Sequence, residues 1–158
     1  MNRAQQIAAT LTDILEGDPW YASCVKANLH GISAVAAASQ PLAGAHTIWE
    51  IASHMDAWNH VCLRRASGEV VAEAPVNFPV PEEITPDEWR SVQVRLDNSC
   101  RQIIVRVGNL TDADLAAIVP GKDYTVDFLM EGIGHHWIYH SGQIAMLRRG
   151  LGIHAETE

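Results

Sequence analysis

Histidines are the residues of this sequence whose spacing suits chemistry. His136 and His140 are four positions apart, in line with Ile133 and Ile144. On an α-helix this spacing means about 6 Å of rise and roughly 40° of rotation, so both imidazoles leave one face. That face carries the apolar stripe expected to point into a core, where two polar rings need partners. The pair therefore predicts one side of a metal site.

A third ligand has to come from another helix, because a catalytic metal site needs three or more protein ligands. His54 is the natural candidate, since it lies three residues after Ile51 and four before Trp58 and so borders the apolar stripe of its own helix. Three neutral imidazoles favour zinc, nickel, copper or iron over magnesium or calcium, which prefer oxygen ligands. We therefore expect His54, His136 and His140 to hold one divalent transition metal.

Two other interpretations of the pair stay open at this point. Histidines four apart also occur on solvated helix faces and as hydrogen-bonded pairs in a core, and spacing alone does not separate these from ligands. The pair has no glutamate of the His-Glu-x-x-His type, because Trp137 and Ile138 follow His136. A metalloprotease that uses such a motif is therefore excluded.

Other polar residues lie near these positions. Glu50 is one turn before His54 and either orients that imidazole or completes the helix cap that Thr47 begins. Gln143 follows His140 by three and is expected to face the site. The remaining two candidates, His46 and His135, are predicted to have structural or surface roles. Neither is expected to be a ligand.

Small, aromatic and sulfur-containing residues are assigned to packing. Gly142 is expected to permit the close approach of another helix, and three tryptophans are expected in the core or at an interface, namely Trp49, Trp58 and Trp137. The three cysteines are far apart and form no CxxC pair, which indicates buried thiols in a reducing compartment. They are Cys24, Cys62 and Cys100.

Four long helices are needed to position these residues. The first ends at residues 17–19, after apolar residues at helical spacing. Trp20, Val25 and Leu29 are candidates for a second short helical stretch, and residues 33–45 predict a helical turn followed by a loop. The second long helix is expected from about Thr47 to residues 67–68.

The second half of the chain begins with residues 69–86, a proline-containing connection without periodicity. It is a candidate to cover either a site or a partner chain. Thr85 and Pro86 then signal the start of a third long helix, which ends at residues 108–109. Residues 111–114 predict a short extra turn. The fourth long helix is expected from about Thr125 to residues 148–150, where Arg148 and Arg149 suit the helix dipole.

The pattern as a whole predicts an all-α protein, a four-helix bundle that forms a single domain over residues 1–158. Long connections after the first two helices allow a crossover topology as well as a simple up-and-down order. The length and the hydrophobic content of 47% suffice for a core without disulfides.

Charge and hydropathy restrict the partners and the compartment. With 11 Lys and Arg against 19 Asp and Glu, the formal net charge is -8, which argues against nucleic acid as a partner. The start of the chain lacks the uninterrupted apolar stretch of a signal peptide, and no later run is long enough to span a bilayer. We therefore expect a cytoplasmic protein that does not act in a membrane.

Two segments resemble a known family. Residues 44–58, GAHTIWEIASHMDAW, and residues 132–152, GIGHHWIYHSGQIAMLRRGLG, are similar to the DinB-like superfamily. That superfamily includes YfiT-type proteins, grouped as metal-dependent hydrolases and thiol transferases. The resemblance implies that His54, His136 and His140 bind nickel or zinc, with water completing the coordination. It also implies a four-helix bundle with up-down-down-up topology, often as a homodimer.

Two functions follow from this resemblance and remain open. In the first, the chain is a metal-dependent hydrolase or thiol-S-transferase, in which water or a small thiol occupies an open metal position and attacks a small-molecule substrate. Glu50 is then the one candidate for a general base. In the second, the ion only ties helices together in a non-catalytic, stress-associated or ligand-binding bundle. A metal-free chain whose histidines merely form hydrogen bonds is a third possibility.

Overall fold

The fold is all-α in the computed structural model of this protein, which describes residues 1–74 and 76–153. Four of its seven helices are long: α1 (Arg3–Glu16), α4 (Ile48–Ala66), α5 (Pro86–Gly108) and α7 (Val126–Gly150). Three are single short turns: α2 (Val25–Leu29), α3 (Ala34–Ala38) and α6 (Asp112–Ala116). The described residues form no strand, and none of their helices is both long and apolar enough to cross a membrane.

Side-chain caps begin the helices at the positions that the sequence predicts. Thr47 accepts a hydrogen bond from the backbone N–H of Glu50, whose carboxylate accepts from the backbone N–H of Thr47, so the capping box of α4 is complete. Thr85 caps α5, with a proline in its first turn, and Thr125 caps α7. Thr111 forms another capping box at α6. These signals were sufficient to place every long helix after the first within a residue or two.

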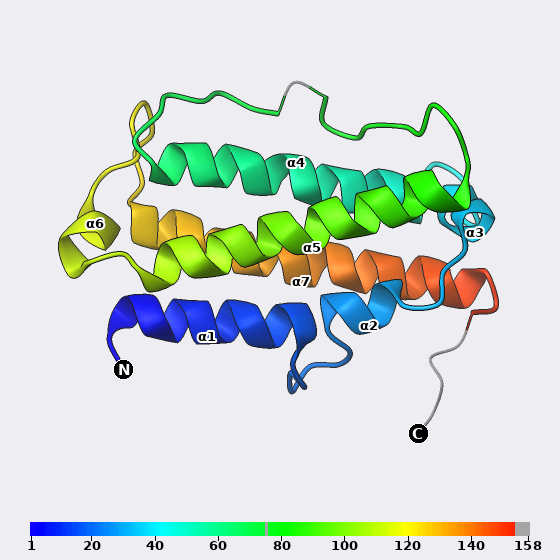
Figure 1. The fold of residues 1–158 in the computed structure, drawn as a ribbon, viewed down its shortest axis with the longest axis horizontal. Helices are drawn as coiled ribbons and strands as arrows, with labels where there is room; N and C mark the ends of the chain where they lie inside the picture. Colours follow the sequence, from blue (N-terminus) through cyan, green and yellow to red (C-terminus); the bar gives the residue numbers. More distant parts are fainter. Residues whose placement is uncertain (75, 154–158) are drawn as a thin grey trace.

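The four long helices pack around a common apolar core. α4 lies against α5 and α7, and α1 also packs against α5 and α7. In Figure 1, α1 and α7 run from left to right, whereas α4 and α5 run from right to left. The neighbours α4 and α7 are therefore antiparallel, which brings the middle of α4 next to the middle of α7.

Residues 67–85 connect two helices that run in the same direction, α4 and α5. Such a connection must return along the length of the protein, and Figure 1 shows it running back beside α4. Its described residues contain no helix or strand, as their prolines predict. Length and direction together place this segment over one side of α4.

The sequence-based interpretations of Trp20 and Gly142 are wrong, and that of Arg148 is incomplete. Trp20 is fully exposed and precedes α2, whose buried apolar residues are Val25 and Leu29. Gly142 has open space beside it, so it does not serve a close helix approach. Gly134 does, because a Cβ there would lie 3.0 Å from Cδ2 of Leu11 on α1. The buried Arg148 does more than suit the dipole of α7, because its guanidinium donates to the backbone carbonyls of Ala27 and Asn28 at the end of α2.

A polar group is buried between α4, α5 and α7, and we call its members, Asn59, Ser99, Cys100 and Trp137, the asparagine cluster. The side chain of Asn59 is fully buried and donates to Oγ of Ser99 at 3.0 Å and to Sγ of Cys100 at 3.2 Å. Its oxygen accepts from Nε1 of Trp137 at 2.8 Å. Every polar atom of this side chain therefore has a partner.

The three cysteines are buried free thiols, as expected. Burial raises the pKa of Cys62 and of Cys100 to about 12, so both are protonated and unreactive at neutral pH. They fill space in the core. This outcome agrees with their assignment to packing.

Candidate metal centre

Three imidazoles from two helices converge in one place. α4 supplies His54, and α7 supplies His136 and His140 one turn apart. The ring centroids of His136 and His140 are 4.4 Å apart, and that of His54 lies 5.0 Å from the first and 4.6 Å from the second. One nitrogen from each ring lies within 4.8 Å of the other two. We call these residues the histidine cluster.

Hydrogen bonds fix the orientation of two of the rings. Nδ1 of His54 lies 2.7 Å from the backbone oxygen of Asn77, and because a carbonyl only accepts, this nitrogen carries the proton. Nδ1 of His140 likewise donates to Oε1 of Gln143 at 2.6 Å. The proton on Nδ1 leaves a lone pair on Nε2 of each ring, which is the form that binds a metal.

The third ring, His136, lacks a complete set of partners. Its Nε2 lies 3.0 Å from Nε2 of His54, and its Nδ1 is buried without a hydrogen-bond partner among the described residues. With the proton on Nε2, the bare Nδ1 is a buried acceptor without a donor. With the proton on Nδ1, two lone pairs face each other at Nε2. Neither tautomer satisfies the site from protein groups alone.

The same burial keeps the rings neutral. Burial, together with the neighbouring His140 and His54, lowers the pKa of His136 to about 3. The pKa values of His54 and His140 are also lowered, in each case mainly by burial. Neutral imidazole is the form that ligates a metal, so at neutral pH no proton has to be removed before an ion enters.

The arrangement fits a small divalent cation. Tetrahedral zinc with bonds of 2.0–2.1 Å to nitrogen places two ligand nitrogens about 3.3 Å apart. The nitrogens of the histidine cluster lie from 3.0 Å to at most 4.8 Å apart, so small side-chain adjustments suffice. A cation at this point would also remove the conflict between the facing lone pairs of His54 and His136. All-nitrogen donors suit a transition metal better than magnesium or calcium.

Comparison with known families gives one result, a match of residues 27–144 to the model of the DinB superfamily. The chain belongs to the DinB superfamily. The matched residues include all three members of the histidine cluster. No curated protein and no solved structure matches the chain. The family assignment therefore agrees with the resemblance seen in the sequence.

In this DinB-superfamily chain, the connection between α4 and α5 lies against His54 of the histidine cluster. Phe78 stacks on His54 with ring centroids 4.1 Å apart and planes within 4° of parallel. His46 stacks on the other face of Phe78, with ring centroids 3.6 Å apart. Asn77 also accepts from Nε1 of Trp58 at 2.8 Å through its side chain, which ties the connection to α4. The connection thus supplies both a hydrogen-bond partner and an aromatic wall.

The structure decides between the two roles that the sequence left open for Glu50. Oε2 of its carboxylate accepts from the backbone N–H of Thr47 at 2.7 Å, and Oε1 lies 3.6 Å from Nδ1 of His46. The acceptor that orients His54 is instead the backbone oxygen of Asn77. No sequence signal marks this oxygen, because any residue has one. Glu50 is therefore a cap that also faces His46.

Three further residues near the histidine cluster were also interpreted from the sequence. His135 is exposed and outside the histidine cluster, and Gln143 does face the site. His46 was assigned a structural or surface role, and it is about half exposed, yet it also lines a cavity beside His140. Its position just before the capping box of α4, the helix that carries His54, was the available signal.

Proposed function

We propose that this chain binds one divalent transition-metal ion, zinc or nickel, through His54, His136 and His140. The observation that carries the proposal is the unsatisfied centre of the histidine cluster, where Nε2 atoms of His54 and His136 face each other at 3.0 Å and a third ring closes the group. Membership of the DinB superfamily and the neutral state of the imidazoles both support it.

For the fold we propose the DinB-like four-helix bundle with up-down-down-up topology, as a single domain over residues 1–158. The directions of α1, α4, α5 and α7 in Figure 1 support this topology, because the first and last run one way and the middle two the other. The long connection between α4 and α5 agrees with it. A homodimer and a cytoplasmic location stay predictions.

For the activity we propose a metal-dependent hydrolase or thiol-S-transferase. Within the described residues, the group of candidate ligands has three members, which would leave a coordination position open. A divalent metal bound there would lower the pKa of a water or a thiol and so supply a nucleophile near neutral pH. His54 and His140 hold their rings through Asn77 and Gln143, and Phe78 shields one side from water.

The alternative is a non-catalytic bundle in which the ion only links α4 and α7. Such a site is expected to be closed by a fourth protein ligand. The described residues offer no further His, Cys, Asp or Glu to the histidine cluster, and a cavity reaches His140, so the open site is better supported. Small-molecule substrates or thiols are accordingly the partners that we propose.

Elemental analysis of the purified, tag-free protein tests the proposal, with two variants on the same helix. We expect about one zinc or nickel per chain in the wild type. His140→Ala should lose the metal, whereas the exposed neighbour His135→Ala should retain it. A metal-free wild type that also fails to bind added zinc or nickel would contradict the proposal, as would unchanged metal content in His140→Ala.

A further inference from the structure

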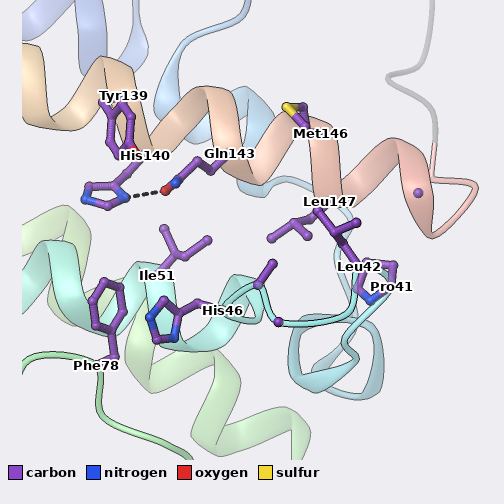
Figure 2. A pocket seen from close by; sticks show the side chains of 13 residues that line it. Pro41, Leu42, His46, Ile51, Phe78, Tyr139, His140, Gln143, Met146 and Leu147 are labelled. Atoms are coloured by element: carbon purple, nitrogen blue, oxygen red, sulfur yellow. Dashed lines mark hydrogen bonds between the residues drawn. The ribbon is translucent and has the colours of Figure 1, made fainter.

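A cavity of about 730 Å³ lies beside the histidine cluster. α7 forms one wall, and the segment before α4 together with the start of α4 forms the opposite wall. Figure 2 shows His140 at one end and Pro41 with Leu42 at the other. Its volume is that of cavities which bury most of a small organic molecule. Because His140 lines both the cavity and the candidate metal centre, a molecule in the cavity would reach the centre.

The walls of this cavity carry no charged side chain of the Asp, Glu, Lys or Arg type among the described residues. This is notable in a chain with a net charge of -8, where acidic groups are frequent elsewhere. A charged group held against these walls would lose water without gaining an opposite charge, and only the His140 end would have one, from the proposed metal ion. The walls therefore select for a ligand whose body is uncharged.

Polar groups in the cavity gather at one end. His46, His140 and Gln143 lie toward the histidine cluster, whereas Leu42 and Met146 are apolar residues farther from it (Figure 2). The oxygen of Gln143 already accepts from Nδ1 of His140, so the carboxamide has its two N–H donors to offer to a ligand. The cavity thus has an apolar part and a single polar end.

We propose that this cavity binds the substrate of the candidate metal centre, and that the substrate has an uncharged, apolar body and one polar reacting group at the His140 end. This inference rests on the proposed function for the identity of the reacting end. The Gln143 carboxamide positions an acceptor atom of the substrate, and the apolar end near Leu42 and Met146 sets the size of the body. The same walls disfavour a molecule that carries a charge on its body.

Two fluorescent probes with one skeleton test the selection by charge. N-phenyl-naphthylamine is uncharged, and anilinonaphthalene sulfonate carries an anion on the same ring system. We expect saturable binding of one uncharged probe per chain, with the sulfonate at least about tenfold weaker, because a buried anion without a partner costs more than about 1.4 kcal/mol. Equal binding of the two probes would overturn the proposal.

A matched pair of variants places the binding in this cavity. Met146 lines the cavity and is 67% exposed, and Val105 on α5 is 64% exposed and lies elsewhere. Met146→Glu should weaken the uncharged probe about tenfold, and Val105→Glu, with the same change in net charge, should leave it unchanged. Unchanged binding in Met146→Glu, or equal loss in both variants, would refute the assignment of the probe to this cavity.

Cobalt-loaded protein connects the cavity to the metal. We expect benzyl mercaptan, an uncharged apolar thiol, to displace the probe and to change the cobalt absorption spectrum. Mercaptoethanesulfonate, an anionic thiol, should need at least about tenfold higher concentration. The two failures are distinguishable: a protein that binds the probe but no cobalt refutes the proposed function, and one that binds cobalt but responds equally to both thiols refutes the substrate class.

Discussion

The asparagine cluster and the histidine cluster are both buried between α4 and α7, and they differ in how far their hydrogen bonds are completed. Each polar atom of the Asn59 side chain has a partner within the protein. In the histidine cluster, Nδ1 of His136 has none among the described residues, and two Nε2 atoms face each other. Buried polar groups are rarely left in this state. The first cluster therefore stabilises the fold, whereas the second leaves hydrogen-bonding groups available for the metal ion that we propose.

The helices themselves do not explain this difference. His54 and Asn59 are five residues apart on α4, and His136 and Trp137 are adjacent on α7. Neighbouring residues on a helix point about 100° apart, so a single pair of helices directs one side chain to each cluster. What separates the clusters is which partners meet there: an amide meets a hydroxyl and an indole N–H in one, and imidazole meets imidazole in the other.

The largest effect is expected in the asparagine cluster. Asn59→Leu keeps the branched shape of the side chain but leaves Nε1 of Trp137 without its acceptor, while the hydroxyl of Ser99 keeps only its bond to the backbone oxygen of Leu96. We expect the free energy of unfolding to fall by about 3 kcal/mol, because a buried orphan donor costs about 1–3 kcal/mol and the larger leucine has to fit into a packed core. Urea unfolding measures this loss. The exposed Asn98→Leu on α5 is the control and should change stability by no more than about 0.5 kcal/mol.

This variant also separates the two clusters, because its folded fraction should still bind metal. A loss of metal from Asn59→Leu under conditions where it remains folded would show that the clusters act as one network.

Added metal should stabilise the protein only through the histidine cluster. At a free zinc concentration one hundred times the Kd, binding to the folded state raises the free energy of unfolding by about 2.7 kcal/mol. Thermal or urea unfolding with and without zinc, after treatment with a chelator, measures this increase. We expect it in the wild type and in His135→Ala, and we expect none in His140→Ala. Equal stabilisation of His140→Ala would place the ion elsewhere.

The stability of the metal-free protein should depend on pH in a direction that the lowered pKa values set. Between the folded-state pKa of each ring and its ordinary value of 6.5, the unfolded chain binds more protons than the folded chain. The free energy of unfolding therefore rises with pH in this window. The contribution of the three histidines to this free energy is fully present above about pH 6.5. It is lost as the pH falls, by up to about 1.4 kcal/mol per pH unit for each histidine.

Urea unfolding of chelator-treated protein at a series of pH values between about 7.5 and 5 tests this expectation. For His136 the window extends down to a pKa of about 3, so its contribution continues over the whole series. Replacing His136 by Leu should reduce the slope, whereas replacing the exposed His135 should not. A stability that is constant over the series would contradict the burial of the three rings as neutral groups.

The sequence alone was sufficient to predict the long helices and the positions of the three histidines on them, because both follow from local patterns. The capping boxes at Thr47 and Thr111 and the proline after Thr85 fix helix starts, and a spacing of four residues places His136 and His140 on one face. The meeting of His54 with that pair was also anticipated from its position on an apolar stripe. The DinB resemblance rested on the same residues.

The periodicity of the sequence did not predict which residues surround the three histidines. Asn77 orients His54 through a backbone oxygen, and Phe78 stacks on the same ring, yet both belong to an aperiodic connection whose path depends on the packing of distant helices. His46 was assigned a structural or surface role because it falls just outside the capping box of α4. Gly142 was expected to permit the close approach of another helix, but Gly134 does so instead. Spacing alone does not reveal which face of α7 meets α1.

The smallest expected effect is the one that separates the clusters most sharply. In metal-free protein, His136→Leu removes the contact between Nε2 atoms, but it also removes the buried Nδ1 that has no partner among the described residues. The two changes oppose each other, so we expect the free energy of unfolding to change by no more than about 1 kcal/mol, while metal binding is lost. The exposed His135→Leu is the control for the loss of an imidazole from α7.

A polar-to-leucine substitution would then be costly in the asparagine cluster and nearly neutral in the histidine cluster. If His136→Leu instead destabilises the protein as much as Asn59→Leu, the imidazoles form a structural hydrogen-bond network, and the contrast between the clusters disappears.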